Sequence, residues 1–148
     1  IRFLPGMLKE FIEAGVEIRG CPLTQKIVKG DVRRATEKDY ATEYLDLKLS
    51  VKVMENIDEA INHINFYGSH HSDAIITDNQ KAADYFLKKI DSACVYHNAS
   101  TRFTDGSQFG MGAEIGISTD RIHARGPMAL EELTTYKYII HGNGQVRK

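Results

Sequence analysis

The chain has 148 residues, of which 42% are hydrophobic and 26% are charged, and its formal net charge is −1 at pH 7. These values are typical of one soluble globular domain; they disfavour disorder and give no basic surface for nucleic acid. No apolar run reaches the length of a bilayer span, so no membrane partner is expected. Two cysteines, Cys21 and Cys94, are too few for a disulfide framework and indicate a reducing, cytoplasmic setting.

The N-terminal part predicts a helix followed by a short strand. Apolar residues recur at helical spacing over residues 3–12, and Gly15 stands where a helix commonly ends. A strand is expected over Val16–Arg19. Residues 22–42 are polar and weakly periodic, which favours a surface connection with room for one short helix.

The middle of the chain predicts alternating strands and helices. Residues 45–54 alternate between apolar and polar side chains, which indicates a strand. Asn56, with Glu59 three residues later, resembles a capping box that opens a helix over 57–65. Gly68 is expected to end this helix.

The same alternation continues toward the C-terminus. A short buried strand is expected over Ala74–Thr77, Asp78 is expected to cap a second helix, and another strand covers Cys94–Tyr96. Strand, helix, strand, helix and strand with short loops predict three parallel strands joined by right-handed crossovers. Residues 98–126 are rich in glycine and small polar residues, and Thr134–Ile140 again has strand-like composition.

The loop after residue 97 is the first candidate site. Ligands of open α/β sheets gather beyond the carboxyl ends of the strands. Residues 98–106 bring an amide, three hydroxyls and the guanidinium of Arg102 into one loop, a combination that suits a carboxylate or a phosphate. The alternative is a loop whose polar groups bond only its own backbone.

Other chemical signals are weaker. His70, His71 and Asp73 lack the spacing of a metal site, because adjacent side chains of an extended segment point to opposite faces. The glycines of residues 110–116 do not follow a dinucleotide-binding pattern. Neither cysteine stands in a setting that marks an activated nucleophile. No metal is therefore expected.

Six stretches together carry a resemblance to a known family: residues 42–47, 57–75, 98–106, 109–119, 123–128 and 130–138. They are similar to the C-terminal part of the gamma-glutamyl phosphate reductases, also called glutamate-5-semialdehyde dehydrogenases, in the aldehyde dehydrogenase superfamily. The resemblance implies an α/β fold, with a three-layer αβα catalytic-domain portion and a largely parallel sheet over residues 1–132. An oligomerisation strand and tail would follow at 133–148, so a homo-oligomer is expected.

The resemblance also implies an activity. It is the NADPH-dependent conversion of gamma-glutamyl phosphate to glutamate 5-semialdehyde and phosphate, in proline biosynthesis and in the cytoplasm. The intermediate would be a thioester on a cysteine that lies upstream of Ile1 in the family. No catalytic residue is therefore expected in this chain, and the chain by itself should not catalyse the reaction.

Site residues follow from the same resemblance. Glu43 matches the glutamate that holds the ribose of the nicotinamide cofactor, although Leu45–Leu47 replace the aromatic residue and Gly-Pro that usually follow it. The residues that match the loop lining the substrate entrance are Asn98, Ser100, Thr101 and Arg102. Arg102 is the expected anion contact. The alternative is a fragment without turnover, which only self-associates or binds a small anion.

Overall fold

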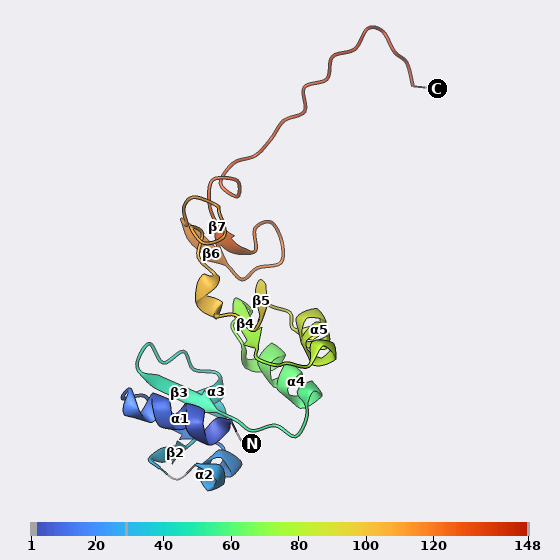
Figure 1. Cartoon of the computed structure of the whole chain (residues 1–148). Coiled ribbons are helices and arrows are strands. Elements are labelled where there is room, and N and C mark those ends of the chain that lie inside the picture. The colour runs from blue at the N-terminus through green and yellow to red at the C-terminus, as the bar shows by residue number, and fades with distance from the viewer. Residues whose placement is uncertain (1–2, 29, 148) are drawn as a thin grey trace. The chain divides into compact units, whose positions relative to one another are not determined.

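The computed structural model describes residues 3–28 and 30–147. They form two compact units. The first comprises the chain up to Gly68 together with Asn79–Ile90, and the second comprises Ser69–Asp78 together with the chain from Asp91 onward. Helices and mostly parallel strands make up the fold (Figure 1), so the predicted α/β class is confirmed.

A three-stranded parallel sheet forms the centre of the first unit. Strand β1 (Glu17–Gly20) lies between β2 (Val32–Arg34) and β3 (Lys48–Val51). Its Ile18 is fully buried and is in register with both neighbouring strands. Because β1 has a partner on each edge, its backbone is satisfied by the sheet, and the side chain of Ile18 is free to form the core.

Helix α1 (Leu4–Glu13) supplies the other half of this core. Its Leu8 is fully buried and clusters with Ile18 and with Val28, while Phe3, before the helix, is 72% exposed. Gly15 follows the helix with a φ of +83°, a conformation that glycine adopts without the steric cost of a Cβ. The predicted helix and its end are confirmed to within a residue or two.

The segment 22–42 has more structure than the weak periodicity indicated. It contains helices α2 (Pro22–Ile27) and α3 (Glu37–Tyr40), with β2 between them, so the expectation of a surface connection with one short helix is wrong. Elements this short do not complete enough turns or alternations to leave a periodic pattern. Strand β2 is recognisable only by its pairing with β1.

The strand expected over residues 45–54 is shorter than its alternation suggested. Only Lys48–Val51 pairs with β1, whose own length is four residues. Leu45 and Leu47 precede the strand and are 88% and 62% exposed. The hydrophobic pattern therefore extends beyond the strand that the neighbouring backbone is able to pair.

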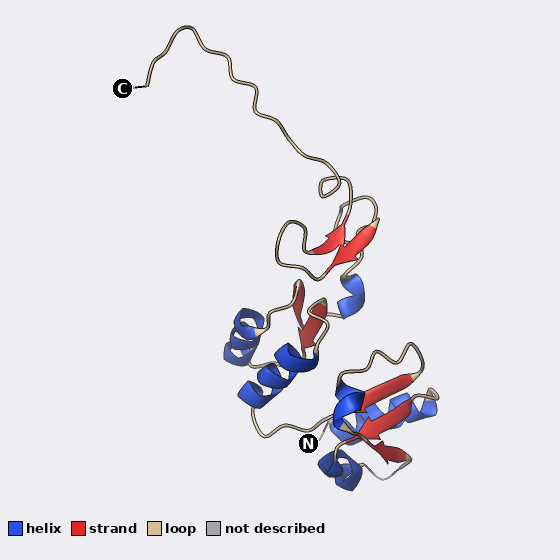
Figure 2. Cartoon of the chain, turned by 180° about the vertical axis from the view of Figure 1, so that it is seen from behind, coloured by secondary structure: helices blue, strands red, loops and turns tan. Residues whose placement is uncertain are grey.

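Helices α4 (Ile57–Tyr67) and α5 (Gln80–Lys89) belong to the first unit. Figure 2 distinguishes the helices of the chain, in blue, from its strands, in red. The side chain of Asn56 accepts a hydrogen bond from the Glu59 N–H at 2.9 Å, which confirms the predicted cap of α4. For α5 the cap is Asn79, which accepts from the Ala82 N–H, and not the predicted Asp78. Both residues favour helix starts, so composition does not separate them.

Two small sheets belong to the second unit. Strand β4 (Ser72–Ile75) is parallel to β5 (Cys94–His97), and β6 (Gly116–Ser118) is antiparallel to β7 (Gly126–Met128). The expected single sheet of three consecutive parallel strands is wrong, because β3 pairs with β1 whereas β4 and β5 pair with each other. Periodicity identifies a strand but not its partner.

Beyond β7 the chain continues into an extended tail. The described residues 133–147 contain no strand, so the expected strand over Thr134–Ile140 does not form within the single chain. A strand requires a partner for its backbone groups, and no backbone–backbone hydrogen bond joins residues 135–142 to other described residues. Separately, none of the described helices is both long and apolar enough to cross a membrane.

One side chain of the first unit is both charged and buried. Asp39 is 5% exposed and accepts hydrogen bonds from the Thr36 hydroxyl, the Thr36 N–H, the Arg19 guanidinium and the Tyr44 hydroxyl. These donors, with the two from Thr36 contributing most, hold the pKa of the Asp39 carboxyl well below its usual range. The cluster joins β1, α3 and the segment that leads into β3.

Truncating Leu8 tests the core. Leu8→Ala is expected to lower the free energy of unfolding by about 2–5 kcal/mol, because it leaves a cavity beside Ile18 and Val28. Urea unfolding of the full chain, followed by far-UV circular dichroism, measures the change. Phe3→Ala is the control and should change the value by less than about 0.5 kcal/mol. A Leu8→Ala protein as stable as the control would contradict this description of the core.

The Asp39 cluster predicts a dependence of stability on pH. The pKa of Asp39 is lowered in the folded state, so its stabilisation is complete above about pH 4, the usual pKa of an unfolded aspartate, and is lost as the pH falls further. Asp39→Asn should be less stable than the parent chain at pH 7, and the difference should shrink in acid. Thermal unfolding at several pH values measures it; a difference independent of pH would contradict the prediction.

Candidate functional site

Glu43 lies in the irregular segment between α3 and β3, in the first unit. The carboxylate is exposed and makes no hydrogen bond or ion pair with any described residue. Its neighbours on both sides are held: the Thr42 hydroxyl donates to the Lys38 carbonyl at 2.6 Å, and the Tyr44 hydroxyl donates to Asp39 at 2.9 Å. A free carboxylate is thus presented by a restrained backbone.

The residue after Tyr44 is strained. Leu45 has a φ of +51°, in the left-handed region that a bulky side chain rarely occupies, and it is 88% exposed. Such a conformation persists where the surrounding structure over-determines it, and it is concentrated at binding and catalytic sites. An exposed leucine beside a free carboxylate is suited to a ligand with an apolar face and hydroxyl groups.

The loop after β5 belongs to the second unit. It begins at the carboxyl end of β5, which is parallel to β4. Asn98 has a φ of +53°, and its side-chain amide is bonded twice to the backbone of Thr77: it accepts from the Thr77 N–H at 2.9 Å and donates to the Thr77 carbonyl at 3.0 Å. Asn98 therefore fastens the loops that follow the two strands to each other. The polar groups of its side chain are already in use.

A hydroxyl cluster anchors the far end of this loop. The Thr104 hydroxyl lies 2.8 Å from the Ser72 hydroxyl and 2.7 Å from the Tyr96 hydroxyl. Next to it, a Cβ on Gly106 would lie 2.1 Å from the carbonyl oxygen of Ala113, so only glycine fits there. The Gly106 N–H also donates to Glu114 at 3.0 Å. The loop is therefore fixed at both ends to residues distant in sequence.

The part of the loop between these anchors is presented outward. Residues Thr101–Phe103 form a single 3₁₀ turn, η1, and the Ser100 hydroxyl caps it by accepting from the Arg102 N–H at 3.2 Å. Thr101 and Arg102 are exposed, and neither side chain has a hydrogen-bonding or ionic partner among the described residues. Arg102 is therefore a free cation on an anchored turn, a geometry that can receive a carboxylate or a phosphate.

Of the residues that the sequence singled out, Asn98, Ser100, Thr101 and Arg102 lie together in one loop, and Glu43 belongs to the other unit. Thr104 belongs to the predicted loop as one of its three hydroxyls, but its anchoring role, and the part that Ser72 and Tyr96 take in it, were not predicted. Their contact joins positions up to 32 residues apart, and no local pattern signals such a contact.

The cysteines differ in their surroundings. Cys21 caps α2 and is buried; burial disfavours its thiolate, but hydrogen bonds from the Thr24 hydroxyl and from backbone N–H groups, including that of Val53, outweigh burial and lower the pKa of the thiol. No local pattern around Cys21 predicted this setting. Cys94 begins β5 and is half-buried, in agreement with its expected place in a strand.

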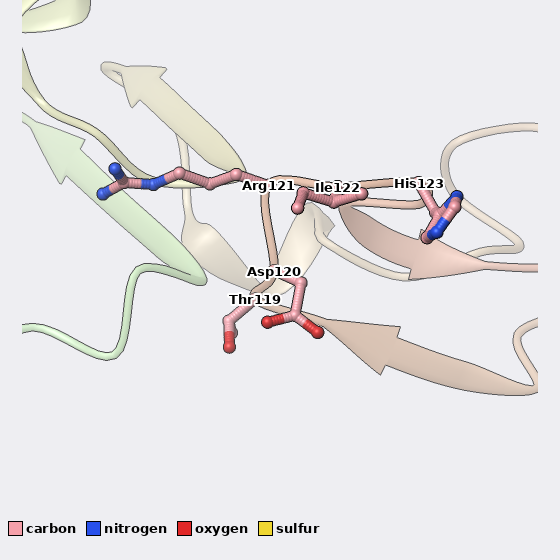
Figure 3. Close-up of a pocket in the computed structure, with 5 residues that line it drawn as sticks. All are labelled: Thr119, Asp120, Arg121, Ile122 and His123. Atoms are coloured by element: carbon pink, nitrogen blue, oxygen red, sulfur yellow. The ribbon is translucent and has the colours of Figure 1, made fainter.

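One cavity lies in the loop between β6 and β7. It has a volume of about 600 Å³ and is lined by residues 119–123. Its side chains do not converge: Arg121 and His123 point in opposite directions (Figure 3), and Arg121 is paired with Asp91. A ligand there would find few polar groups facing it, so this cavity is a poor candidate site.

The histidine pair takes part in local contacts. A ring nitrogen of His70 lies 3.0 Å from the Asp91 carbonyl, and one of His71 lies 3.0 Å from the Ser72 hydroxyl. Within the part of the chain that the structure describes, no three His, Cys, Asp or Glu side chains are grouped as a metal site would require.

The known proteins that match the chain in sequence share one name. No family model matches the chain. The gamma-glutamyl phosphate reductase of Caldanaerobacter subterraneus subsp. tengcongensis is 65% identical over 147 residues, which are 99% of this chain and 35% of that protein. The reductase of Nautilia profundicola is 58% identical over 145 residues, with 98% and 35% covered.

Solved structures agree. The crystal structure of the gamma-glutamyl phosphate reductase from Thermotoga maritima is 57% identical, with a TM-score of 0.93, over 99% of this chain and 35% of that one. The Saccharomyces cerevisiae enzyme is 32% identical, with a TM-score of 0.51, over 67% and 26%. The chain thus spans about a third of its relatives' length, and in sequence and fold it corresponds to a C-terminal portion of the gamma-glutamyl phosphate reductases.

Proposed function

We propose that this chain is part of an NADPH-dependent reductase of proline biosynthesis that converts gamma-glutamyl phosphate to glutamate 5-semialdehyde and phosphate. One observation carries the proposal: a match across 99% of the chain, at 65% identity, to a relative of that name. The TM-score of 0.93 to the Thermotoga maritima enzyme supports the same reading.

In the proposed reaction, a cysteine thiolate attacks the acyl carbon of gamma-glutamyl phosphate, a thioester forms and phosphate leaves. When bound, NADPH supplies the hydride that reduces the thioester, and release of the aldehyde restores the thiolate. The sequence resemblance assigns this cysteine to a position outside the chain. The contribution of the chain itself is then to bind and orient the cofactor and the substrate.

Glu43 is the proposed cofactor contact. Its carboxylate is exposed and unpartnered among the described residues, so both oxygens are available to accept from the two hydroxyls of a ribose. The restrained segment around it reduces the entropy that would be lost on binding. These features fit a nicotinamide nucleotide.

Arg102 is the proposed substrate contact. A guanidinium offers a planar fork of donors that matches both the carboxylate and the phosphate of gamma-glutamyl phosphate. The neighbouring Thr101 hydroxyl is free to assist. Ser100 and Asn98, which already bond the backbone, are proposed to shape the loop around the substrate.

The tail is proposed to form a homo-oligomer by adding a strand to the sheet of another subunit. Tyr136, Tyr138 and Ile140 alternate along it and are 79%, 81% and 88% exposed, and the rings of the two tyrosines are 5.4 Å apart. Unpaired backbone with an apolar face is the feature that such a strand addition uses. A cytoplasmic setting is proposed as well, supported by two unpaired cysteines.

A small-anion-binding module without turnover is the second candidate. The guanidinium of Arg102, which has no partner among the described residues and stands on an anchored turn, supports this candidate as it supports the substrate contact of the reductase. This candidate requires anion binding but no reduction of NADP+.

A chimeric enzyme tests the proposed function. This chain would replace the matching segment of the Thermotoga maritima reductase, and the assay follows phosphate-dependent reduction of NADP+ with glutamate 5-semialdehyde. The chimera is expected to be active. Arg102→Ala should raise the KM of phosphate or of the semialdehyde on the order of tenfold, as expected for the loss of a charged hydrogen bond.

Arg34→Ala is the matched control, because Arg34 is also exposed and has no ion pair among the described residues. It should leave both KM values unchanged. A folded but inactive chimera would overturn the reductase assignment and favour the binding module. An active chimera that is insensitive to Arg102→Ala would overturn only the contact proposed for Arg102.

The tail makes a separate prediction. The chain, of 16.7 kDa, should elute as an oligomer in size-exclusion chromatography with light scattering, and Tyr138→Lys should shift it toward the monomer. A lysine on the proposed strand places a charge against the apolar face of the neighbouring subunit. Val146→Lys, at a residue that is 82% exposed but outside the alternating run, is the control. Equal masses for the two variants would contradict the proposed strand addition.

A further inference from the structure

The buried carboxylate of Asp39 lies close in sequence to the proposed cofactor contact. One of its oxygens accepts from the Arg19 guanidinium at 2.6 Å and from the Tyr44 hydroxyl at 2.9 Å. The other accepts from the N–H and the hydroxyl of Thr36, each at 2.6 Å. A carboxylate bonded on both oxygens and excluded from water is a rigid point in the structure.

Arg19 is held as firmly as Asp39. Its Nε donates to Glu17 at 2.8 Å, and Glu17 also pairs with Arg33 at 3.0 Å. The guanidinium carbon of Arg19 lies 5.3 Å from the centroid of the Tyr44 ring, within range of a cation–π contact. Tyr44 is thereby fixed twice, through its hydroxyl by Asp39 and through its ring by Arg19.

The residues around Tyr44 show the effect of its contacts with Asp39 and Arg19. Glu43 has no partner of its own among the described residues, and Leu45 holds a strained, exposed conformation. After them, the Leu47 carbonyl accepts from the Glu17 N–H at 2.9 Å, at the start of β1. Between the anchors at Tyr44 and Leu47, strain has to be balanced by contacts. Tyr44 provides such contacts on the C-terminal side of Glu43, as Thr42 does on the N-terminal side.

We propose that Arg19, Asp39 and Tyr44 form a positioning network that holds Glu43 in place for the cofactor. None of the three touches the ligand; they act through the backbone on either side of Glu43. This proposal rests on the proposed function of Glu43 and extends it to the residues behind it. Its physical effect is to order the segment before the cofactor arrives, so that binding does not lose that entropy.

A double-mutant cycle on the chimeric enzyme separates positioning from a purely structural role. Tyr44→Phe removes the hydroxyl bond to Asp39 and keeps the ring over Arg19. It should raise the KM of the cofactor about fivefold, as expected for one hydrogen bond, with a much smaller change in kcat. Glu43→Gln should raise the same KM at least as much. If Tyr44 acts through Glu43, the double variant should be no worse than Glu43→Gln alone.

Tyr85→Phe is the matched control. The Tyr85 hydroxyl donates to Asp58 at 2.6 Å, in the same unit but on α5, so this variant loses a similar bond and should keep the parent KM. Hydrogen exchange of the full chain provides a second measurement. Amides of residues 42–47 should exchange faster in Tyr44→Phe than in Tyr85→Phe.

Failures of the two proposals are distinguishable. An unchanged KM in Glu43→Gln would overturn the assignment of Glu43 to the cofactor, and the positioning proposal with it. A raised KM in Glu43→Gln, combined with no effect of Tyr44→Phe or with the same fold-change in both backgrounds, would overturn the positioning network alone. Equal exchange at residues 42–47 in the two tyrosine variants would also overturn it.

Discussion

A carboxylate that is removed from water must be paired and hydrogen-bonded, and Asp39 meets this requirement by drawing separate parts of the first unit together. Arg19 comes from the central strand, Thr36 from the start of α3, and Tyr44 from the segment before β3. None of these groups satisfies Asp39 alone. The segment with Glu43 is therefore tied to the central strand, because Asp39 bonds both Arg19 and Tyr44, the residue after Glu43.

The second unit follows a similar principle with neutral groups. Its loop after β5 is long and polar, and most of its polar side chains satisfy the backbone or one another. Asn98 bonds Thr77, and Thr104 bonds Ser72 and Tyr96. What is left exposed is the short turn with Arg102. Anchoring residues thus flank the turn that is proposed to bind the ligand, and an inventory of polar residue types does not separate the two groups.

The spacing of residues along the chain was sufficient to predict an element where that element is long enough to show a periodic pattern. Helix α1, the cap of α4 and the parallel strands β4 and β5 agree with the spacing of apolar and capping residues to within one or two positions. It was insufficient for α2, β2 and α3, which are each six residues or fewer, and for the extent of β3. Pattern also misassigned the partner of β3, because alternation reports that a face is buried and not which strand lies beside it.

Residue spacing was enough to establish the α/β class and the positions of the longer helices. Long stretches shared with relatives were enough to establish the correspondence to a C-terminal portion of the gamma-glutamyl phosphate reductases. The sequence also singled out Glu43 and Arg102. The folded structure was needed to show that Asn98 is engaged while Arg102 has no partner among the described residues, and that Asp39 bonds Tyr44, the residue after Glu43. These features depend on hydrogen bonds between residues far apart in sequence, such as Arg19 with Asp39 and Thr104 with Ser72. Their geometry exists only once the strands have paired.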